Sequence, residues 1–392
     1  MTKRFIRLKE LKADLNKVYT PSEEYLEINT KLQSNEVYNV ITNSECNQIS
    51  TWEHESKDKI YLLGDSSIES IYTRATMRPH SILEKLILES GYNHSVINQG
   101  VSGAQSLNIL NLIINKLGNK QGSTVIVSLP SNDSSVLSLE GGYYNNHWRY
   151  SSIVPALNKN VPRTVIKDYD AYIRNIEMII SVCRILGLNL FLTSIIYTGE
   201  NKKYEKLNKL IKSICKSRDT SFINLECFFK SRAHLFYDEV HLLPQGSKEY
   251  AEIVFSNIKN VLKTDSDIQM SIHNICDHKD LYEKIFWSEY FDSSNLDNVK
   301  VIIDADFCSD CERKQILMSV DYGREDVSTS LLKSSNDKIG YFKYITAPVG
   351  KRVELVIDLE IPFNCLEVRV GLRAWDSKNV RVHNAFVSSI RK

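Results

Sequence analysis

The 392-residue chain lacks any strong excess of charge and any long hydrophobic run. Its 49 lysines and arginines nearly balance its 48 acidic residues, and the net charge of +1 gives no broad field for nucleic acid or an acidic membrane surface. No window approaches the roughly eighteen apolar residues that a membrane-spanning helix needs. We therefore expect neither a nucleic-acid partner nor a membrane span.

The N-terminal stretch MTKRFIRLKELKADLNKVY is charged and amphipathic, and it lacks the unbroken apolar core of a secretory signal. A cytoplasmic protein is the expectation, and a mature chain whose signal has been removed is the alternative. Residues 1–56 as a whole are expected to form a helical and irregular arm.

Metal-binding patterns are also scarce. The eight cysteines include one CxxC pair, Cys308 and Cys311. A structural zinc would need a second pair or a Cys/His partner, for which His273, Cys276 and His278 offer a weak pattern. No Gly-rich phosphate loop is visible. We expect reduced structural thiols, no metal and no resident cofactor.

Short apolar runs alternate with amphipathic stretches between residues 59 and 262. The runs are KIYLL, HSVIN, STVIVSL, LNLFLTS and TSFINL, each bounded by Gly, Ser, Asn or Pro. Strands alternating with helices indicate a parallel sheet covered on both faces. We expect residues 57–263 to form an α/β domain with a five-stranded parallel sheet.

The pattern changes after residue 263. Residues 264–283 read as a connector with a helical piece, and residues 284–392 contain runs that alternate apolar and polar residues between turns. This alternation is typical of an antiparallel β-sandwich. Glycan binding, partner binding or simple cover of the first domain are all open roles for it.

Polar clusters follow four of the predicted strands or their connections. Ser66 lies in GDSS, Gly103 in NQGVSGAQS, Asn132 in LPSNDSS, and Asp238 and His241 in YDEVHLLPQG. Ligands of open parallel sheets bind beyond the carboxyl ends of the strands, so these clusters should meet at one edge. In the alternative interpretation these residues have only structural roles: Ser66 is a helix N-cap, Gly103 a turn glycine, Asn132 a capping residue, and Asp238 and His241 turn residues.

These residues, in this order, resemble the four blocks of the SGNH/GDSL hydrolase family over about residues 59–262. The resemblance implies a flavodoxin-like fold and a Ser66–His241–Asp238 triad. Two features depart from or fall outside the family pattern: Pro130 stands where the third block usually has glycine, and Glu69 has no assigned role.

The chemistry supports the same assignment. A serine hydroxyl needs an adjacent base to become a nucleophile, and Asp238 would hold the His241 imidazole in the required tautomer. The backbone N–H groups of Ser66 and Gly103 and the Asn132 amide could stabilise the resulting oxyanion.

The insert SLEGGYYNNHWRYSSIVP follows Asn132 and is rich in aromatic residues. We expect substrate contacts from Tyr143, Tyr144, His147 and Trp148, because aromatic rings with polar tips suit sugars or acyl groups. A lid that packs on its own aromatic residues is the alternative.

The resulting hypothesis is a serine esterase that acts through an acyl-enzyme on O-acyl, above all O-acetyl, esters of a carbohydrate or another small acylated substrate. A carbohydrate O-acetyltransferase with acetyl-CoA as donor would use the same residues. An inactive glycan-binding protein is the hypothesis from another class, and Pro130 motivates it.

Overall fold

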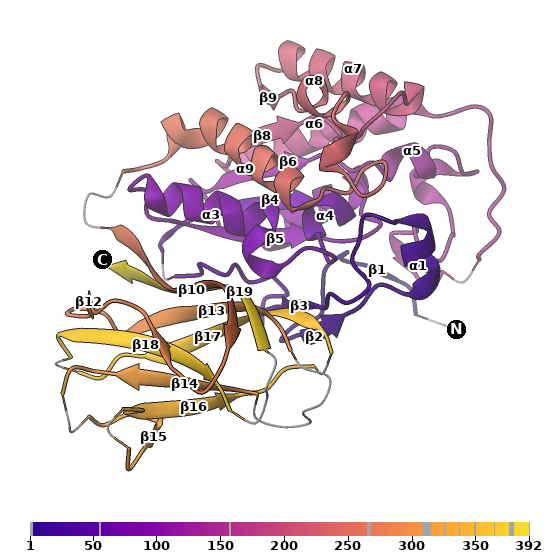
Figure 1. Cartoon of the computed structure of the whole chain (residues 1–392). Coiled ribbons are helices and arrows are strands. Elements are labelled where there is room, and N and C mark those ends of the chain that lie inside the picture. The colour runs from indigo at the N-terminus through magenta and orange to yellow at the C-terminus, as the bar shows by residue number, and fades with distance from the viewer. Residues whose placement is uncertain are drawn as a thin grey trace.

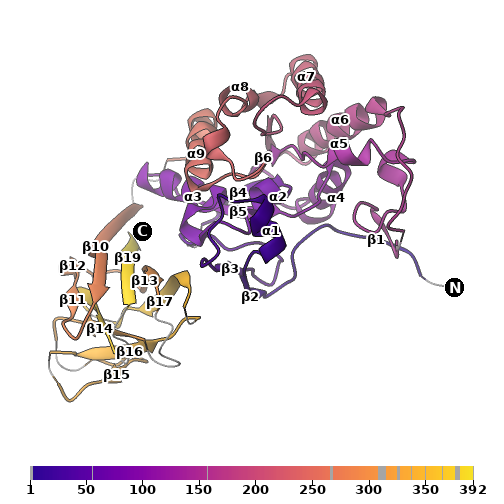
Figure 2. The ribbon, with the colours of Figure 1, turned by 45° about the vertical axis from the view of Figure 1, so that its right-hand side comes forward.

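The computed structural model describes residues 3–391 except 55, 157, 265–267, 308–314, 325–326, 337, 349, 364 and 376–379. An N-terminal arm, an α/β domain and a β domain follow one another along the chain (Figures 1 and 2). The CxxC pair at 308 and 311 lies outside the described residues. No helix in the described ranges is long and apolar enough to cross a membrane.

The α/β domain contains the predicted five-stranded parallel sheet, in the order β5-β4-β6-β8-β9. All five predicted strands are confirmed. Most of their residues are buried because helices cover both faces, which explains the continuous apolar runs. The strands are β4 (Asp58–Gly64), β5 (His94–Gly100), β6 (Thr124–Ser128), β8 (Asn189–Thr193) and β9 (Ser221–Ile223).

Long helices alternate with the strands, as the amphipathic stretches predict, and divide between the two faces of the sheet. One face packs against α4 (Ser106–Lys116), α6 (Tyr169–Ile185) and α7 (Lys202–Ser217). The other packs against α3 (Pro79–Glu89) and α9 (Pro244–Ile258). Short helices lie at the strand ends: α2 (Ser66–Glu69), α5 (Asp133–Val136) and α8 (Glu226–Phe229).

The β domain consists of two antiparallel sheets whose inner faces share one hydrophobic core. One sheet has the order β10-β19-β13-β17, and the other has the order β11-β18-β14-β16-β15 with β12 beside β18. The strands are β10 (Gln269–Leu281), β11 (Phe286–Trp287), β12 (Phe291–Asp292), β13 (Asn298–Asp306), β14 (Ile316–Asp321), β15 (Leu332–Lys333), β16 (Tyr341–Ile345), β17 (Arg352–Glu360), β18 (Glu367–Ala374) and β19 (Val380–Arg391).

The expectation of a connector with a helical piece at 264–283 is wrong. Strand β10 fills most of that segment and pairs with β19, so the β domain begins before residue 284. A register shift between Asn274 and Cys276 and a positive φ at His278 interrupt the alternation of the side chains. Because of this bulge, the sequence of β10 does not show the period-2 alternation by which a strand is recognised.

The N-terminal arm contains one short helix, α1 (Glu23–Ile28), and three short strands. Its first strand, β1 (Phe5–Ile6), pairs with β7 (Ile153–Val154) of the aromatic insert. The other two, β2 (Asn16–Tyr19) and β3 (Tyr38–Ile41), pair with each other. The amphipathic N-terminal stretch therefore crosses the α/β domain as extended chain.

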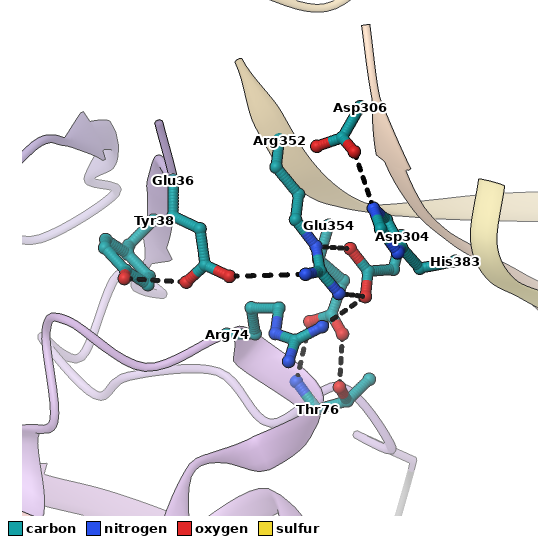
Figure 3. A network of polar contacts seen from close by, with 9 residues as sticks. All are labelled: Glu36, Tyr38, Arg74, Thr76, Asp304, Asp306, Arg352, Glu354 and His383. Atoms are coloured by element: carbon teal, nitrogen blue, oxygen red, sulfur yellow. Dashed lines mark hydrogen bonds and ion pairs between the residues drawn. The ribbon is translucent and has the colours of Figure 1, made fainter. Parts of the chain in front are cut away.

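A polar network joins the α/β domain to the β domain (Figure 3). Asp304 of β13 accepts hydrogen bonds from Arg352 Nε and Nη2 at 2.9 and 2.8 Å, and Arg74 also contacts it. Glu354 is buried and accepts the Thr76 backbone N–H at 2.8 Å and the Thr76 hydroxyl. Arg74 and Thr76 follow α2 closely in the chain, so the β domain holds the loop behind Ser66.

Apolar contacts reinforce this interface. Trp52 stacks on Phe386 of β19 with ring centroids 6.1 Å apart, and Leu88 and Ile302 are buried in the same cluster. In Figure 1 the β domain lies beside the α/β domain and the arm, with β10 near α3 and β17 near β3.

Candidate active site

The serine of the first block lies where β4 ends and α2 begins. Asp65 is the N-cap of α2, and its carboxylate accepts the Ser67 N–H at 3.0 Å. The alternative reading of Ser66 as a helix cap is therefore wrong. Because Asp65 caps the helix, the Ser66 hydroxyl remains available to other partners.

The structure brings Ser66, His241 and Asp238 into one hydrogen-bonded chain. The His241 Nε2 lies 2.8 Å from the Ser66 Oγ, and the His241 Nδ1 lies 2.6 Å from the Asp238 Oδ2. The other Asp238 oxygen accepts the backbone N–H groups of Val240 and His241 at 2.9 and 2.8 Å. Asp238 therefore stabilises the turn from 238 to 241 with one oxygen and orients the imidazole with the other.

The electrostatics of Asp238 fit this role. Burial alone would raise its pKa, but the hydrogen bond and charge of His241 and the two backbone donors together hold the pKa of the carboxyl below its ordinary value. Asp238 thus remains ionised at neutral pH and favours the proton on the Nδ1 of His241.

The N-terminal arm supports the loop that carries His241. The Tyr237 ring stacks on the His241 ring with centroids 5.3 Å apart and planes 5° apart, and its hydroxyl is hydrogen-bonded to Tyr25 of α1. Lys31 donates to the carbonyls of Ala233 and Phe236 at 2.7 and 2.6 Å. Sequence reasoning missed these residues because their contacts join segments about 200 positions apart.

Asp65 also joins the first and third blocks. Its Oδ2 accepts the Ser131 N–H at 2.8 Å, the Ser131 hydroxyl at 2.9 Å and the Asn132 Nδ2 at 3.1 Å. Asn132 stands at the N-cap position of α5 but makes no side-chain capping bond. Its amide therefore lies beside the serine turn despite Pro130.

Gly103 and Glu69 form the other side of the turn. Gly103 has a φ of +76°, which favours glycine. Glu69 is buried, and its carboxylate accepts the Ser102 N–H at 2.6 Å and the Ser102 hydroxyl. Burial raises the pKa of Glu69, although these hydrogen bonds oppose the rise. Glu69 thus anchors the loop that carries Gly103, a role that the sequence did not reveal.

The close approach of α2 to the end of β5 also requires a glycine. A Cβ on Gly100 would lie 2.6 Å from the Glu69 backbone nitrogen. Within the described residues, the N–H groups of Ser66 and Gly103 donate to no protein acceptor. Both remain available to an oxyanion.

Of the four aromatic-insert residues expected to contact substrate, Tyr143 is placed elsewhere. It is 3% exposed, and its hydroxyl donates to Asp133 at 2.5 Å. Asp133 also accepts the Ser106 hydroxyl at 2.8 Å. Tyr143 is therefore part of the protein core and presents no ring surface to a ligand, which corrects that expectation.

The other three residues expected to contact substrate, Tyr144, His147 and Trp148, are at least partly exposed. Tyr144 is 81% exposed and Trp148 is 49% exposed. The His147 ring lies 6.0 Å from Trp148 and stacks on Tyr150 at 5.1 Å. The insert therefore combines the two readings of the sequence: it packs partly on its own rings and leaves Tyr144 and Trp148 open.

No group of three metal-ligating side chains occurs among the residues that the structure describes. His273 stacks on Phe291 at 4.2 Å, and Cys276 is buried in the β-domain core. Cys276 is a free thiol, and the packing of both residues is that of structural side chains.

Comparison with known proteins agrees with this geometry. The GDSL-like lipase/acylhydrolase family matches residues 60–254. The α/β domain belongs to this family, whose members are hydrolases of ester bonds, and it has the SGNH fold.

Several solved structures are similar to about half of the chain. A lipase/acylhydrolase from Enterococcus faecalis is 17% identical and covers 53% of this chain and 98% of its own, with a TM-score of 0.38. An acetylxylan esterase from Geobacillus stearothermophilus is 14% identical and covers 52% and 94%, with a TM-score of 0.41. The acetyl xylan esterase AlAXEase is 15% identical and covers 50% and 98%, with a TM-score of 0.40. A search of curated proteins found no match.

Proposed function

We propose that the protein is a serine esterase that removes O-acyl groups, above all O-acetyl groups, from a carbohydrate. The observation that carries the proposal is the unbroken chain of hydrogen bonds from the Ser66 hydroxyl through His241 to Asp238. This arrangement supplies a nucleophile, a base and a group that orients the base.

In the acylation step the Ser66 Oγ attacks the ester carbonyl carbon, and the His241 Nε2 takes the hydroxyl proton. The new C–O bond leaves negative charge on the former carbonyl oxygen. The N–H groups of Ser66 and Gly103 and the Asn132 amide face this charge, and each such donor contributes about 10²–10³ in rate. The tetrahedral intermediate collapses, and His241 returns the proton to the departing sugar oxygen.

In the second step water attacks the acyl-serine, with His241 again as base. The bond to the Ser66 Oγ breaks, acetate leaves, and the serine recovers its proton. A sugar hydroxyl in place of water would complete an acetyl transfer with the same residues, with acetyl-CoA as the donor. An O-acetyltransferase is therefore the second candidate.

The carbohydrate assignment is supported by the exposed rings of Tyr144 and Trp148. Aromatic faces with polar edges suit sugars, which combine apolar C–H surfaces with hydroxyl groups. The acetylxylan esterases named above act on acetylated sugar polymers by their names, and we extend that class to this chain as a proposal.

Two experiments test the proposal. A fluorophosphonate should label Ser66 in the wild type and not in Ser66→Ala; an unlabelled, folded wild type would favour the inactive glycan-binding alternative. Acetylated donor is then supplied with and without an oligosaccharide acceptor. Free acetate that stays flat while acetylated acceptor accumulates would replace the esterase by the transferase.

A further inference from the structure

Two cationic side chains from distant segments lie beside Gly103, and the charge of a third acts on one of them. Arg7 and Lys9 come from the N-terminal arm, and Arg149 comes from the aromatic insert. A Cβ placed on Gly103 would lie 3.2 Å from the Arg149 Nε and 3.4 Å from the Lys9 Nζ. Arg149 and Lys9 thus border the glycine whose N–H is assigned to the oxyanion hole, and Arg7 acts on Lys9 through its charge.

Backbone pairing holds the cluster in place. β1 pairs with β7, and the Arg7 N–H donates to the Ser152 carbonyl at 2.8 Å. The Lys9 Nζ donates to the Arg149 carbonyl at 3.4 Å, and the Gln105 side chain at the start of α4 donates to the Tyr150 carbonyl at 2.7 Å. These hydrogen bonds therefore hold the arm and the insert together beside Gly103.

Lys9 is buried beside like charges. Lys9 is only 7% exposed. Burial lowers its pKa to about 8, with further lowering by the charges of Arg7 and Arg149, and Glu69 opposes the shift. Glu69, the acid whose charge acts on Lys9, already accepts two hydrogen bonds from Ser102.

We propose that Arg149 and Lys9, with the charge of Arg7 near Lys9, bind an anionic group of the substrate at the rim of the active site. The inference rests on the proposed esterase function and narrows its substrate class to acyl esters of acidic carbohydrates. A guanidinium binds carboxylate or phosphate oxygens through paired N–H donors, and Arg149 is exposed enough to reach them. A ligand anion would also relieve the repulsion that acts on Lys9.

The test uses the full chain and three acetylated probes that differ in one group: a methyl glucuronide, a methyl glucoside 6-phosphate and a neutral methyl glucoside. The variant Arg149→Gln removes the exposed cation. Arg163→Gln is the control, since Arg163 is also exposed and follows the insert in the chain, where its backbone bridges to Leu139. We expect the wild type to prefer at least one acidic probe by about 10-fold to 100-fold in kcat/KM, chiefly through KM.

Arg149→Gln should reduce this preference about tenfold or more, and Arg163→Gln should retain it. Raising the salt concentration should also weaken it, because exposed charges are screened. The two acidic probes distinguish a carboxylate subsite from a phosphate subsite. Equal kcat/KM for all three probes in the wild type, or an unchanged preference in Arg149→Gln, would overturn the inference.

Calorimetric titration with the unacetylated methyl glucuronide and methyl glucoside 6-phosphate separates this inference from the proposed function. Binding of either anion that Arg149→Gln abolishes, in a protein that hydrolyses no ester, would retain the anion subsite and reject the esterase. Ester hydrolysis without anion binding or acidic preference would retain the esterase and reject the subsite.

Discussion

Replacement of Asp65 by asparagine tests whether Asp65 positions Asn132 beside the Ser66 turn. Asp65 is 1% exposed, and its two oxygens accept five hydrogen bonds from Ser67, Ser131 and Asn132. An asparagine keeps one carbonyl oxygen and turns an NH₂ group toward the donors on its other side. Two or three hydrogen bonds to a charged acceptor are lost, each of about 1.5–3 kcal/mol before relaxation.

We therefore expect Asp65→Asn to lower the free energy of unfolding by about 2–4 kcal/mol after relaxation. We also expect kcat on an aryl acetate to fall about 10²–10³-fold, because the Asn132 amide loses the contact that orients it. Denaturant unfolding and initial rates measure the two effects. Asp168→Asn is a control, since Asp168 also caps a helix, through the Ala171 N–H at 2.9 Å, and its ion-pair partner is Arg174.

A double-mutant cycle separates positioning from a general loss of stability. Asn132→Ala alone should reduce kcat by a similar factor at a smaller cost in stability. If Asp65 acts through Asn132, the double variant should be little slower than either single variant. Fully additive losses, or an Asp65→Asn enzyme within threefold of the wild-type kcat, would refute the reasoning.

Three further predictions address the nucleophile, the insert and a buried acid. Ser66→Ala should leave thermal unfolding nearly unchanged and activity below about one per cent of wild type; higher activity would count against its role as nucleophile. Trp148→Ala should raise KM for an acetylated oligosaccharide more than for a small aryl ester, and equal effects would make the ring structural. Burial raises the pKa of Asp133 from 3.8 to about 7. The folded protein therefore keeps this proton over a pH range in which the unfolded chain loses it, and the free energy of unfolding falls as the pH rises from about 4 to about 7. Melting curves of wild type and Asp133→Asn should therefore diverge over that range in favour of the variant, and a constant difference would contradict the assignment.

The sequence predicts the parallel sheet well because strands buried on both faces must be continuously apolar. It also predicts that Ser66, Asn132 and His241 meet, because the carboxyl ends of parallel strands share one edge. Both arguments use local pattern and a general rule of topology, and neither needs side-chain packing.

The parts that the sequence does not predict depend on contacts between distant segments. β10 escapes detection because its bulge interrupts the alternation of side chains. Tyr143 looks like a ligand-binding ring until the buried Asp133 is seen to hold its hydroxyl. The support of the His241 loop by Lys31 and Tyr25 requires that the arm be placed in space first.

The network in Figure 3 bears on how this protein can be dissected. A fragment that ends at residue 263 would retain the whole triad, yet it would strip Arg74 and Thr76 of their carboxylate partners and uncover Trp52. Such a fragment would keep its catalytic residues and lose the contacts that support the loop behind Ser66. A fusion of the α/β domain to another protein, or a replacement of the β domain, would therefore have to retain Asp304 of β13 and Glu354 of β17 or supply equivalent carboxylates.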